Sequence, residues 1–375
     1  MFDKYFNYLS YYKWWKNLDK LIFSLIICFF IIGLFFSLVS TSLVASDKLD
    51  TNSYFFFFKH LTFVAIGLII IFILSYIEIK TLHIFSIYFF FVSLILLVLV
   101  QFFGIEIKGS KRWLDLIFLP RIQPVEFIKP FYIVVLALII SNKKFANIFI
   151  KFFFSFFLTF IISLLLIMQP DFGQTLLIGF SWITLIFVSG INLTFLFSVS
   201  IIGLTSLIYV AFYIPKFQYI KNRILSFFNS ETGTHNAQSE KAIDSITNGG
   251  FFGKGIGEGT LKTRVPEAHT DYIISVIAEE FGIIAIILII LLFLIFIYSV
   301  FKKVENKTNN TSRLILIGSV SLILLQAMIH IGVNIRLFPT TGMTLPFLSY
   351  GGSSIISVSI LSGIILNLTK RKVQI

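Results

Sequence analysis

Eight stretches of this 375-residue chain contain no Asp, Glu, Lys or Arg, and each is about as long as a membrane-spanning helix or longer. A helix needs about 20 predominantly apolar residues to cross the hydrocarbon core of a bilayer. The sequence therefore predicts an all-α, polytopic integral membrane protein. The stretches are Leu21–Ser46, His60–Ile77, Thr81–Ile105, Phe152–Pro170, Phe172–Pro215, Phe281–Phe301, Leu314–Ile335 and Leu337–Thr369.

Three adjustments convert these stretches into a helix count. Phe172–Pro215 is long enough for two spans and has a polar break at 189–192, whereas prolines and glycines confine the last span to the second half of Leu337–Thr369. A further span, at about 123–141, is apolar except for Glu126 and Lys129. The prediction is a ten-helix membrane domain over residues 21–368.

The net charge of +12 would suggest a nucleic-acid ligand in a soluble protein, but in a membrane protein it is typical of basic cytoplasmic loops. Ten helices place both termini on one side. With that side cytoplasmic, its segments carry fifteen Lys and Arg, and the short outer connections carry seven. We therefore predict a cytoplasmic N-terminal segment (1–20), a cytoplasmic basic tail (369–375) and no nucleic-acid partner. The single cysteine, Cys28, excludes an internal disulfide.

Two outer segments break the charge pattern and are where we expect function. The loop 104–122 is basic on the side where positive charge is disfavoured, and the loop 215–270, between helices 7 and 8, is the one large segment outside the membrane. The second loop contains six glycines within 249–259, whose backbone could approach an anion closely, together with Lys254. A merely flexible loop is the alternative interpretation.

Acidic residues in or beside the membrane are the next candidates. Glu126 and Lys129 are three residues apart, so they share a helix face and can pair, either structurally or beside a polar cavity. Asp271 precedes a long apolar helix, where it could cap the helix or serve as a general base. At least one of Glu279 and Glu280 should face the protein interior.

Two shorter segments have simple structural roles as alternatives to function. Asp171 lies in a very short outer connection, where turn chemistry is its simplest role. Residues 346–354 begin the tenth helix with small side chains that allow close helix packing or a hydroxyl-lined cavity wall. Basic loops beside outer carboxylates suit a lipid-linked, phosphate-bearing substrate, and the cytoplasmic side shows no nucleotide-binding motif.

Taken together, and in this order, these segments resemble the SEDS family (shape, elongation, division and sporulation) over about residues 14–368. The segment 339–346 resembles the division branch of the family, because it has Thr344 where the elongation branch typically has proline. The six segments that carry the resemblance are Lys108–Trp113, Gln123–Lys129, Gln169–Gly173, Gly249–Gly257, Pro266–Asp271 with Glu279–Gly282, and Ser349–Ser354.

The resemblance implies a peptidoglycan glycosyltransferase of the bacterial inner membrane, acting at the division septum. Such an enzyme polymerises lipid II, an undecaprenyl-pyrophosphate-linked disaccharide-peptide, at the outer face. Its implied partners are a class B penicillin-binding protein (an FtsI-like transpeptidase) and other division membrane proteins. No nucleotide cofactor is implied, and a divalent cation, Mg²⁺ or Mn²⁺, is an open alternative for stabilising the pyrophosphate.

The resemblance also assigns roles to residues. Asp271 falls on the family's catalytic aspartate, and Glu279, Glu280, His330 and Asn334 are expected to be structural polar residues inside the membrane domain. His330 stands where the family usually has asparagine, and 232–237 lacks the usual tyrosine–glutamine pair. The expected substrate-binding residues are Lys111, Arg112, Trp113, Gln123, Glu126, Lys129, Asp171, Gln238, Ser239, Gly250, Gly253, Lys254, Lys262, Arg264, Glu267, His269, Ser349, Tyr350 and Ser353.

Three other functions compete with the septal enzyme. A lipid II flippase or secondary transporter would use the intramembrane charges as a substrate path. Alternating access needs a gate on each side of the membrane, whereas the loops with candidate functional residues are the outer ones and the inner loops are short. A non-enzymatic division scaffold would not need Asp271. An elongation enzyme is the alternative within the family.

Overall fold

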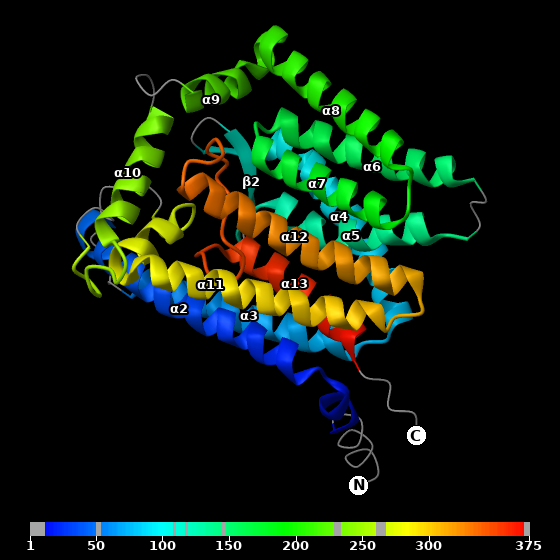
Figure 1. The fold of residues 1–375 in the computed structure, drawn as a ribbon, viewed down its shortest axis with the longest axis horizontal. Helices are drawn as coiled ribbons and strands as arrows, with labels where there is room; N and C mark the ends of the chain where they lie inside the picture. Colours follow the sequence, from blue (N-terminus) through cyan, green and yellow to red (C-terminus); the bar gives the residue numbers. More distant parts are fainter. Residues whose placement is uncertain are drawn as a thin grey trace.

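The computed structural model describes residues 12–49, 54–107, 110–116, 119–143, 147–228, 234–259 and 268–370. Helices dominate these residues (Figure 1). The helices are α2 (Lys20–Leu49), α3 (Phe55–Tyr76), α4 (Ile79–Phe103), α5 (Pro124–Ser141), α6 (Ile148–Met168), α7 (Phe172–Val188), α8 (Leu193–Tyr213), η1 (Pro215–Phe217), α9 (Gln218–Phe228), α10 (Thr234–Gly249), α11 (Ile273–Glu305), α12 (Asn310–Asn334) and α13 (Gly352–Thr369).

The protein is an α-helical membrane protein, as predicted. Among the described residues, eight helices are long and apolar enough to cross a bilayer, and α7 and α8 are shorter apolar helices. These ten helices match the predicted spans one for one, including the division of Phe172–Pro215 into two. The sidedness of the membrane domain stays a prediction.

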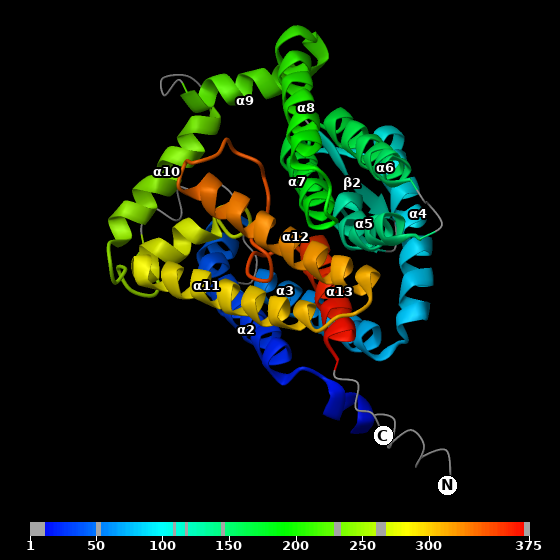
Figure 2. The ribbon, with the colours of Figure 1, turned by 45° about the vertical axis from the view of Figure 1, so that its right-hand side comes forward.

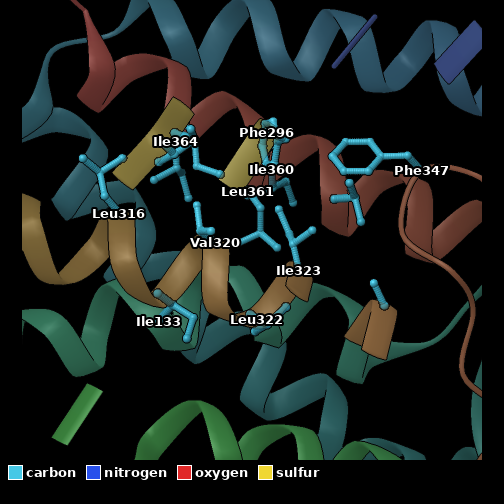
Figure 3. Close-up of a cluster of buried hydrophobic side chains, with 14 of the residues drawn as sticks. Ile133, Phe296, Leu316, Val320, Leu322, Ile323, Phe347, Ile360, Leu361 and Ile364 are labelled. Atoms are coloured by element: carbon cyan, nitrogen blue, oxygen red, sulfur yellow. The ribbon is translucent and has the colours of Figure 1, made fainter. Parts of the chain in front are cut away.

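The helices surround a core built on α5, α12 and α13, most of whose residues are buried. Aliphatic side chains from these helices meet Phe296 of α11 and Phe347 in one cluster (Figure 3). Helices α9 and α10, from the predicted large loop, lie at the end of the bundle away from the two termini (Figures 1 and 2). This end is also where the polar segments singled out by the sequence come together.

The loop 104–122 contains strands that the all-α prediction did not anticipate. Strands β1 (Ile105–Ile107), β2 (Ser110–Leu116) and β3 (Leu119–Ile122) form a small antiparallel sheet in the order β1-β2-β3. Trp113 pairs with Ile105, and Leu114 with Ile122. The ladder gives this polar backbone its hydrogen bonds beside the membrane, which a bare loop would leave unmet.

Helix α11 is broken at Gly282, whose φ of 77° and ψ of 179° are not helical. The break removes the helical hydrogen bonds between the carbonyls of Glu279 and Glu280 and the N–H groups four residues later. The glycine-rich segment supplies the replacements, because Lys254 N donates to Glu279 O (2.9 Å) and Gly255 N donates to Glu280 O (3.1 Å). In return, Ile283 N donates to Gly250 O (3.0 Å).

The glycines of this segment therefore serve close backbone contact within the fold. A Cβ at Gly253 would lie 2.1 Å from Glu280 O, which no side chain can tolerate. The N–H groups of Lys254 and Gly255 bind carbonyls of the broken helix, so these two do not point at an anion as expected.

This contact predicts unequal effects of two similar substitutions. Gly253 and Gly257 both have positive φ, 80° and 86°, so an alanine at either should cost about 1–2 kcal/mol in backbone strain. Only Gly253→Ala adds the clash with α11, because no heavy atom lies within 4 Å of a Cβ at Gly257. We expect a clearly lower thermal unfolding midpoint for Gly253→Ala than for Gly257→Ala in the same detergent. Equal midpoints would contradict the docking of this segment.

Candidate active site

A cavity of about 590 Å³ opens where the strands, helix ends and connecting segments meet. Its walls come from parts of the chain far apart in sequence. They include Arg112 and Trp113 of β2, Glu126 of α5, Gln174 of α7, Arg223 of α9, Gln238 of α10, Asp271 before α11, residues 340–344, and residues 350–354 at the start of α13.

Asp271 lies on this wall with its backbone held in place by neighbouring polar groups. Asn334 Nδ2 donates to Asp271 O (3.1 Å), and Ser349 Oγ donates to Thr270 O (2.7 Å). Tyr350 N donates to His269 O (3.1 Å). Three consecutive carbonyls are thus fixed, so the Asp271 carboxylate projects from a rigid backbone. The capping role considered for Asp271 is not the one observed, since the N-cap of α11 is Tyr272.

The segment 340–344 forms the part of the cavity wall next to the Asp271 side chain. A Cβ at Gly342 would lie 3.6 Å from Asp271 Oδ2 and 3.8 Å from Arg112 Nη1, so the carboxylate and the guanidinium face the same small space beside Gly342. His330 Nδ1 bonds to Met343 O (2.7 Å), and because a carbonyl only accepts, this nitrogen carries the proton. His330 thereby anchors this edge of the cavity.

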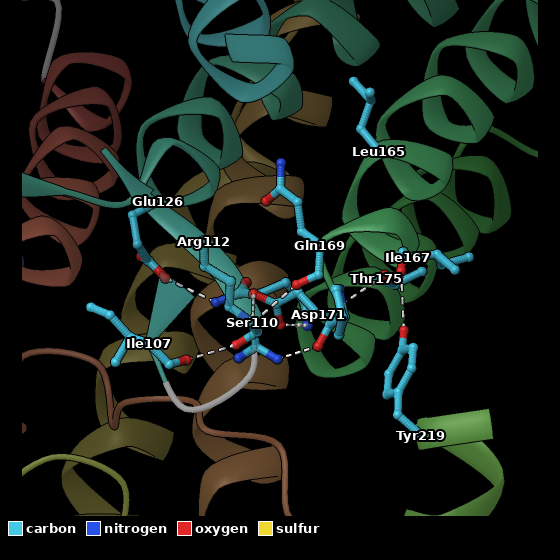
Figure 4. Close-up of polar contacts among 12 residues, drawn as sticks. Ile107, Ser110, Arg112, Glu126, Leu165, Ile167, Gln169, Asp171, Thr175 and Tyr219 are labelled. Carbon is cyan, nitrogen blue, oxygen red and sulfur yellow. Dashed lines mark hydrogen bonds and ion pairs between the residues drawn. The ribbon is translucent and has the colours of Figure 1, made fainter. Parts of the chain in front are cut away.

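Arg112 is fixed by the connection between α6 and α7 (Figure 4). Its guanidinium donates to the carbonyls of Gln169 and Pro170, and Nε lies 3.6 Å from Asp171 Oδ2. Asp171 also caps α7, because Oδ1 accepts from Gln174 N (3.4 Å). Asp171 therefore acts as a support behind the cavity rather than as part of its wall.

A second arginine, Arg223, joins Arg112 at the cavity. Arg223 Nη1 donates to Thr340 O (3.1 Å). Burial lowers the pKa of the Arg223 guanidinium, and the positive charge of Arg112 lowers it further. Burial also raises the pKa of Tyr219 to about 12, despite the opposing effect of Arg223 and Arg112. Guanidinium groups stay protonated at neutral pH, so the pair forms a region of concentrated positive charge, with Asp171 3.6 Å from Arg112.

The predicted intramembrane pair is formed and deeply buried. Lys129 Nζ donates to Glu126 Oε1 (2.7 Å) and to Gln326 Oε1 of α12 (3.0 Å). Gln174 Nε2 of α7 donates to the same oxygen of Glu126 (2.9 Å). Gln326 Nε2 in turn donates to Thr344 O (3.0 Å), which connects the ion pair to the 340–344 wall.

Comparisons with known proteins agree with these features. A model of the family described as "Cell cycle protein", FtsW/RodA/SpoVE, matches residues 19–374. The chain belongs to the FtsW/RodA/SpoVE family. A "Probable peptidoglycan glycosyltransferase FtsW" of Coxiella burnetii (strain RSA 493 / Nine Mile phase I) is 32% identical over 341 residues, covering 88% of this chain and 90% of the relative.

Other members of the FtsW/RodA/SpoVE family are similarly close. "Stage V sporulation protein E" of Bacillus subtilis (strain 168) is 31% identical over 360 residues, covering 94% of this chain and 97% of the relative. The fold matches a chain in "Structural coordination of polymerization and crosslinking by a peptidoglycan synthase complex", with a TM-score of 0.76, 24% identity and coverage of 94% and 97%. The family relationship thus extends across the whole membrane domain.

The cavity gathers only part of the residues expected from the family resemblance. Of the expected binding residues, those that line it are Arg112, Trp113, Gln123, Glu126, Gln238, Tyr350 and Ser353. Ser353 Oγ accepts from Gln123 N (3.1 Å). Lys262, Arg264 and Glu267 lie outside the described residues.

The other expected binding residues lie away from the cavity wall. Lys129 and Asp171 stand behind it, while Ser349 donates to the backbone beside Asp271 and the His269 carbonyl accepts from Tyr350 N. Ser239 is buried beyond the wall, and Gly250, Gly253 and Lys254 contact α11. Lys111 is exposed and does not line the cavity, whereas Arg112 and Trp113 of the same strand do. Glu279 and Glu280 are both buried, as expected for structural residues.

Several cavity residues were missed by sequence reasoning. Arg223 is one of many basic residues in the loop 215–270, and charge counting gives no reason to single it out. Gln174 and Lys59, and Gln326 behind the wall, carry no local signal either, because their importance depends on which helices become neighbours.

The buried pair predicts a non-additive stability pattern. Lys129→Met would leave the Glu126 carboxylate buried without a cation and should cost about 3–5 kcal/mol. Adding Glu126→Gln removes that uncompensated charge, so the double variant should unfold at a higher temperature than Lys129→Met alone. Thermal unfolding of both purified variants in one detergent measures this. A double variant less stable than the single variant would contradict the pairing.

Proposed function

We propose that this chain is a peptidoglycan glycosyltransferase that joins lipid II units into glycan strands at the outer face of the bacterial inner membrane. The observation that carries the proposal is the cavity in which the Asp271 carboxylate and the Arg112 guanidinium face one space beside Gly342. The cavity lies where helices of a membrane domain end, so a lipid-linked substrate can reach it from the bilayer. Curated relatives named peptidoglycan glycosyltransferase support the same reaction.

In the proposed reaction, the 4-hydroxyl of an acceptor sugar attacks C1 of a donor disaccharide. The C1–oxygen bond to undecaprenyl pyrophosphate breaks as the new glycosidic bond forms, and the hydroxyl proton passes to Asp271. One displacement inverts the configuration at C1, so one base is sufficient and no covalent intermediate is needed. The pinned backbone of residues 269–271 suits this role, because a base must be held within about 3 Å of the proton it takes.

The departing pyrophosphate needs positive charge that is already in place. We assign this role to Arg112 and Arg223, because both line the cavity and both are anchored to backbone carbonyls. A guanidinium can donate two parallel hydrogen bonds to phosphate, which gives orientation as well as charge. This assignment replaces Lys111 and Lys254, whose positions lie away from the cavity wall.

The cavity residues do not fit a dedicated metal site. Glu126 is engaged by Lys129, and the described residues contain no group of three or more His, Cys, Asp and Glu side chains that could hold an ion. We therefore assign the described residues no part in holding Mg²⁺ or Mn²⁺ and route no step through a metal.

We further propose the septal role and a transpeptidase partner. Thr344 supports the division branch, and it also accepts the hydrogen bond that connects the buried ion pair to the cavity wall. The solved peptidoglycan synthase complex that contains a similar chain supports a class B penicillin-binding protein as the partner. Complementation of a strain depleted of its own division enzyme, compared with one depleted of its elongation enzyme, would separate the two roles.

The base assignment predicts loss of polymerisation in Asp271→Asn, which keeps the shape of the side chain but accepts no proton. The rate of lipid II polymerisation should fall about a hundred- to ten-thousandfold. The assay uses purified protein with its transpeptidase partner and separates glycan strands on gels. Asp244→Asn, an exposed change on α10 away from the cavity, is the matched control and should retain the wild-type rate.

The result of that assay also separates the competing functions. An Asp271→Asn protein that polymerises at the control rate would contradict the base assignment. A wild-type protein that moves lipid II across vesicles but makes no strands would favour the flippase. A variant that makes no strands but still supports division would favour the scaffold.

The cation assignment predicts a binding defect for Arg223→Gln. Loss of one charge-assisted contact should weaken binding of undecaprenyl pyrophosphate about ten- to hundredfold. Lys221→Gln removes the same charge from the same helix, but Lys221 lies against the Phe212 ring rather than on the cavity wall, so it controls for net charge. Equal effects of the two changes, measured by thermophoresis in nanodiscs, would overturn the role of Arg223.

A further inference from the structure

Two side-chain oxygens that belong to residues lining the cavity have no use in the reaction described above. Glu126 Oε2 and Gln174 Oε1 are buried without a hydrogen-bond partner among the described residues. Both side chains are 3% exposed, and both line the cavity. An acceptor in such a place is costly to leave unmet, so buried polar atoms without partners call for an explanation.

The positions of these oxygens are set by the surrounding network. A carboxylate only accepts hydrogen bonds, so the Gln174 amide must turn its nitrogen toward Glu126 Oε1 and its oxygen away. Lys129 holds the same oxygen of Glu126 and is itself held by Gln326. The two remaining oxygens are therefore fixed acceptors rather than freely rotating groups.

The local charge limits what can bind to these oxygens. Acceptor atoms repel phosphate, which excludes the pyrophosphate of the substrate. The Lys129 ammonium already neutralises Glu126, and a metal ion would also lack further ligands, because the described residues offer no cluster of three acidic, histidine or cysteine side chains. What remains is a neutral group that donates hydrogen bonds, an O–H or an amide N–H.

We propose that Glu126 Oε2 and Gln174 Oε1 form a hydrogen-bond-accepting subsite for a hydroxyl or amide N–H group of the sugar part of the substrate. This assignment rests on the proposed function, because the disaccharide of lipid II carries both kinds of donor. It divides the cavity into a cationic region at Arg112 and Arg223 for the pyrophosphate and a neutral, accepting region for the sugar.

The test compares two ligands that share the lipid and the pyrophosphate. Full-length protein in nanodiscs is titrated with lipid II and with undecaprenyl pyrophosphate, which has no sugar. Gln174→Met keeps the length of the side chain and removes the accepting oxygen together with the N–H that donates to Glu126 Oε1. We expect it to weaken lipid II binding about tenfold or more and to leave undecaprenyl pyrophosphate binding nearly unchanged.

Gln326→Met is the matched control for disturbing the network, because Gln326 does not itself line the cavity but holds Lys129 and the Thr344 carbonyl. It should affect the two ligands equally. If Gln174→Met does not assemble, Gln174→Asn shortens the same amide and answers the same question. A Gln174 effect that is equal for both ligands, or equal to that of Gln326→Met, would overturn the subsite. Wild-type protein that binds neither ligand would instead contradict the proposed function, and the subsite with it.

Discussion

The buried Glu126–Lys129 pair sets the arrangement of the helices that build the cavity. Charges inside a membrane domain are costly unless partners inside the protein meet them. Glu126 and Lys129 lie on α5, and their further partners are Gln174 of α7 and Gln326 of α12. Three helices must therefore keep a fixed register, and each contributes either a cavity residue or a support to the cavity wall.

The same constraint explains the rigidity around Asp271. Polar backbone near a membrane also needs partners, and Asn334 and Ser349 provide them for residues 270 and 271. Groups that satisfy the backbone consequently hold a carboxylate in place before any substrate arrives. Such preorganisation is how a site lowers a barrier without reorganising during the reaction. The repair of the α11 break by the glycine-rich segment follows from the same requirement.

Sequence reasoning succeeded where one physical rule acts locally. Bilayer thickness and the cost of charge determine the spans, and a spacing of three residues on a helix determines that Glu126 and Lys129 can meet. Arg223 and Gln174 escaped because their roles depend on contacts between distant helices. Lys111 was chosen with Arg112 because the strands of the loop 104–122, which leave Lys111 exposed, were not anticipated. Glycine content predicted close approach at 249–259 but not that the partner is the broken helix α11.

The first turn of α7 connects the two regions of the cavity. Asp171 forms an ion pair with Arg112. It is also the N-cap of α7, the helix that carries Gln174 three residues later. Because an N-cap fixes the first turn, the spacing between Arg112 and Gln174 is set by one short piece of helix. A substrate with an anionic pyrophosphate next to a neutral, hydroxyl-rich sugar matches such a division of charge. Under the proposed function, the cavity would orient that substrate through polarity as well as through shape.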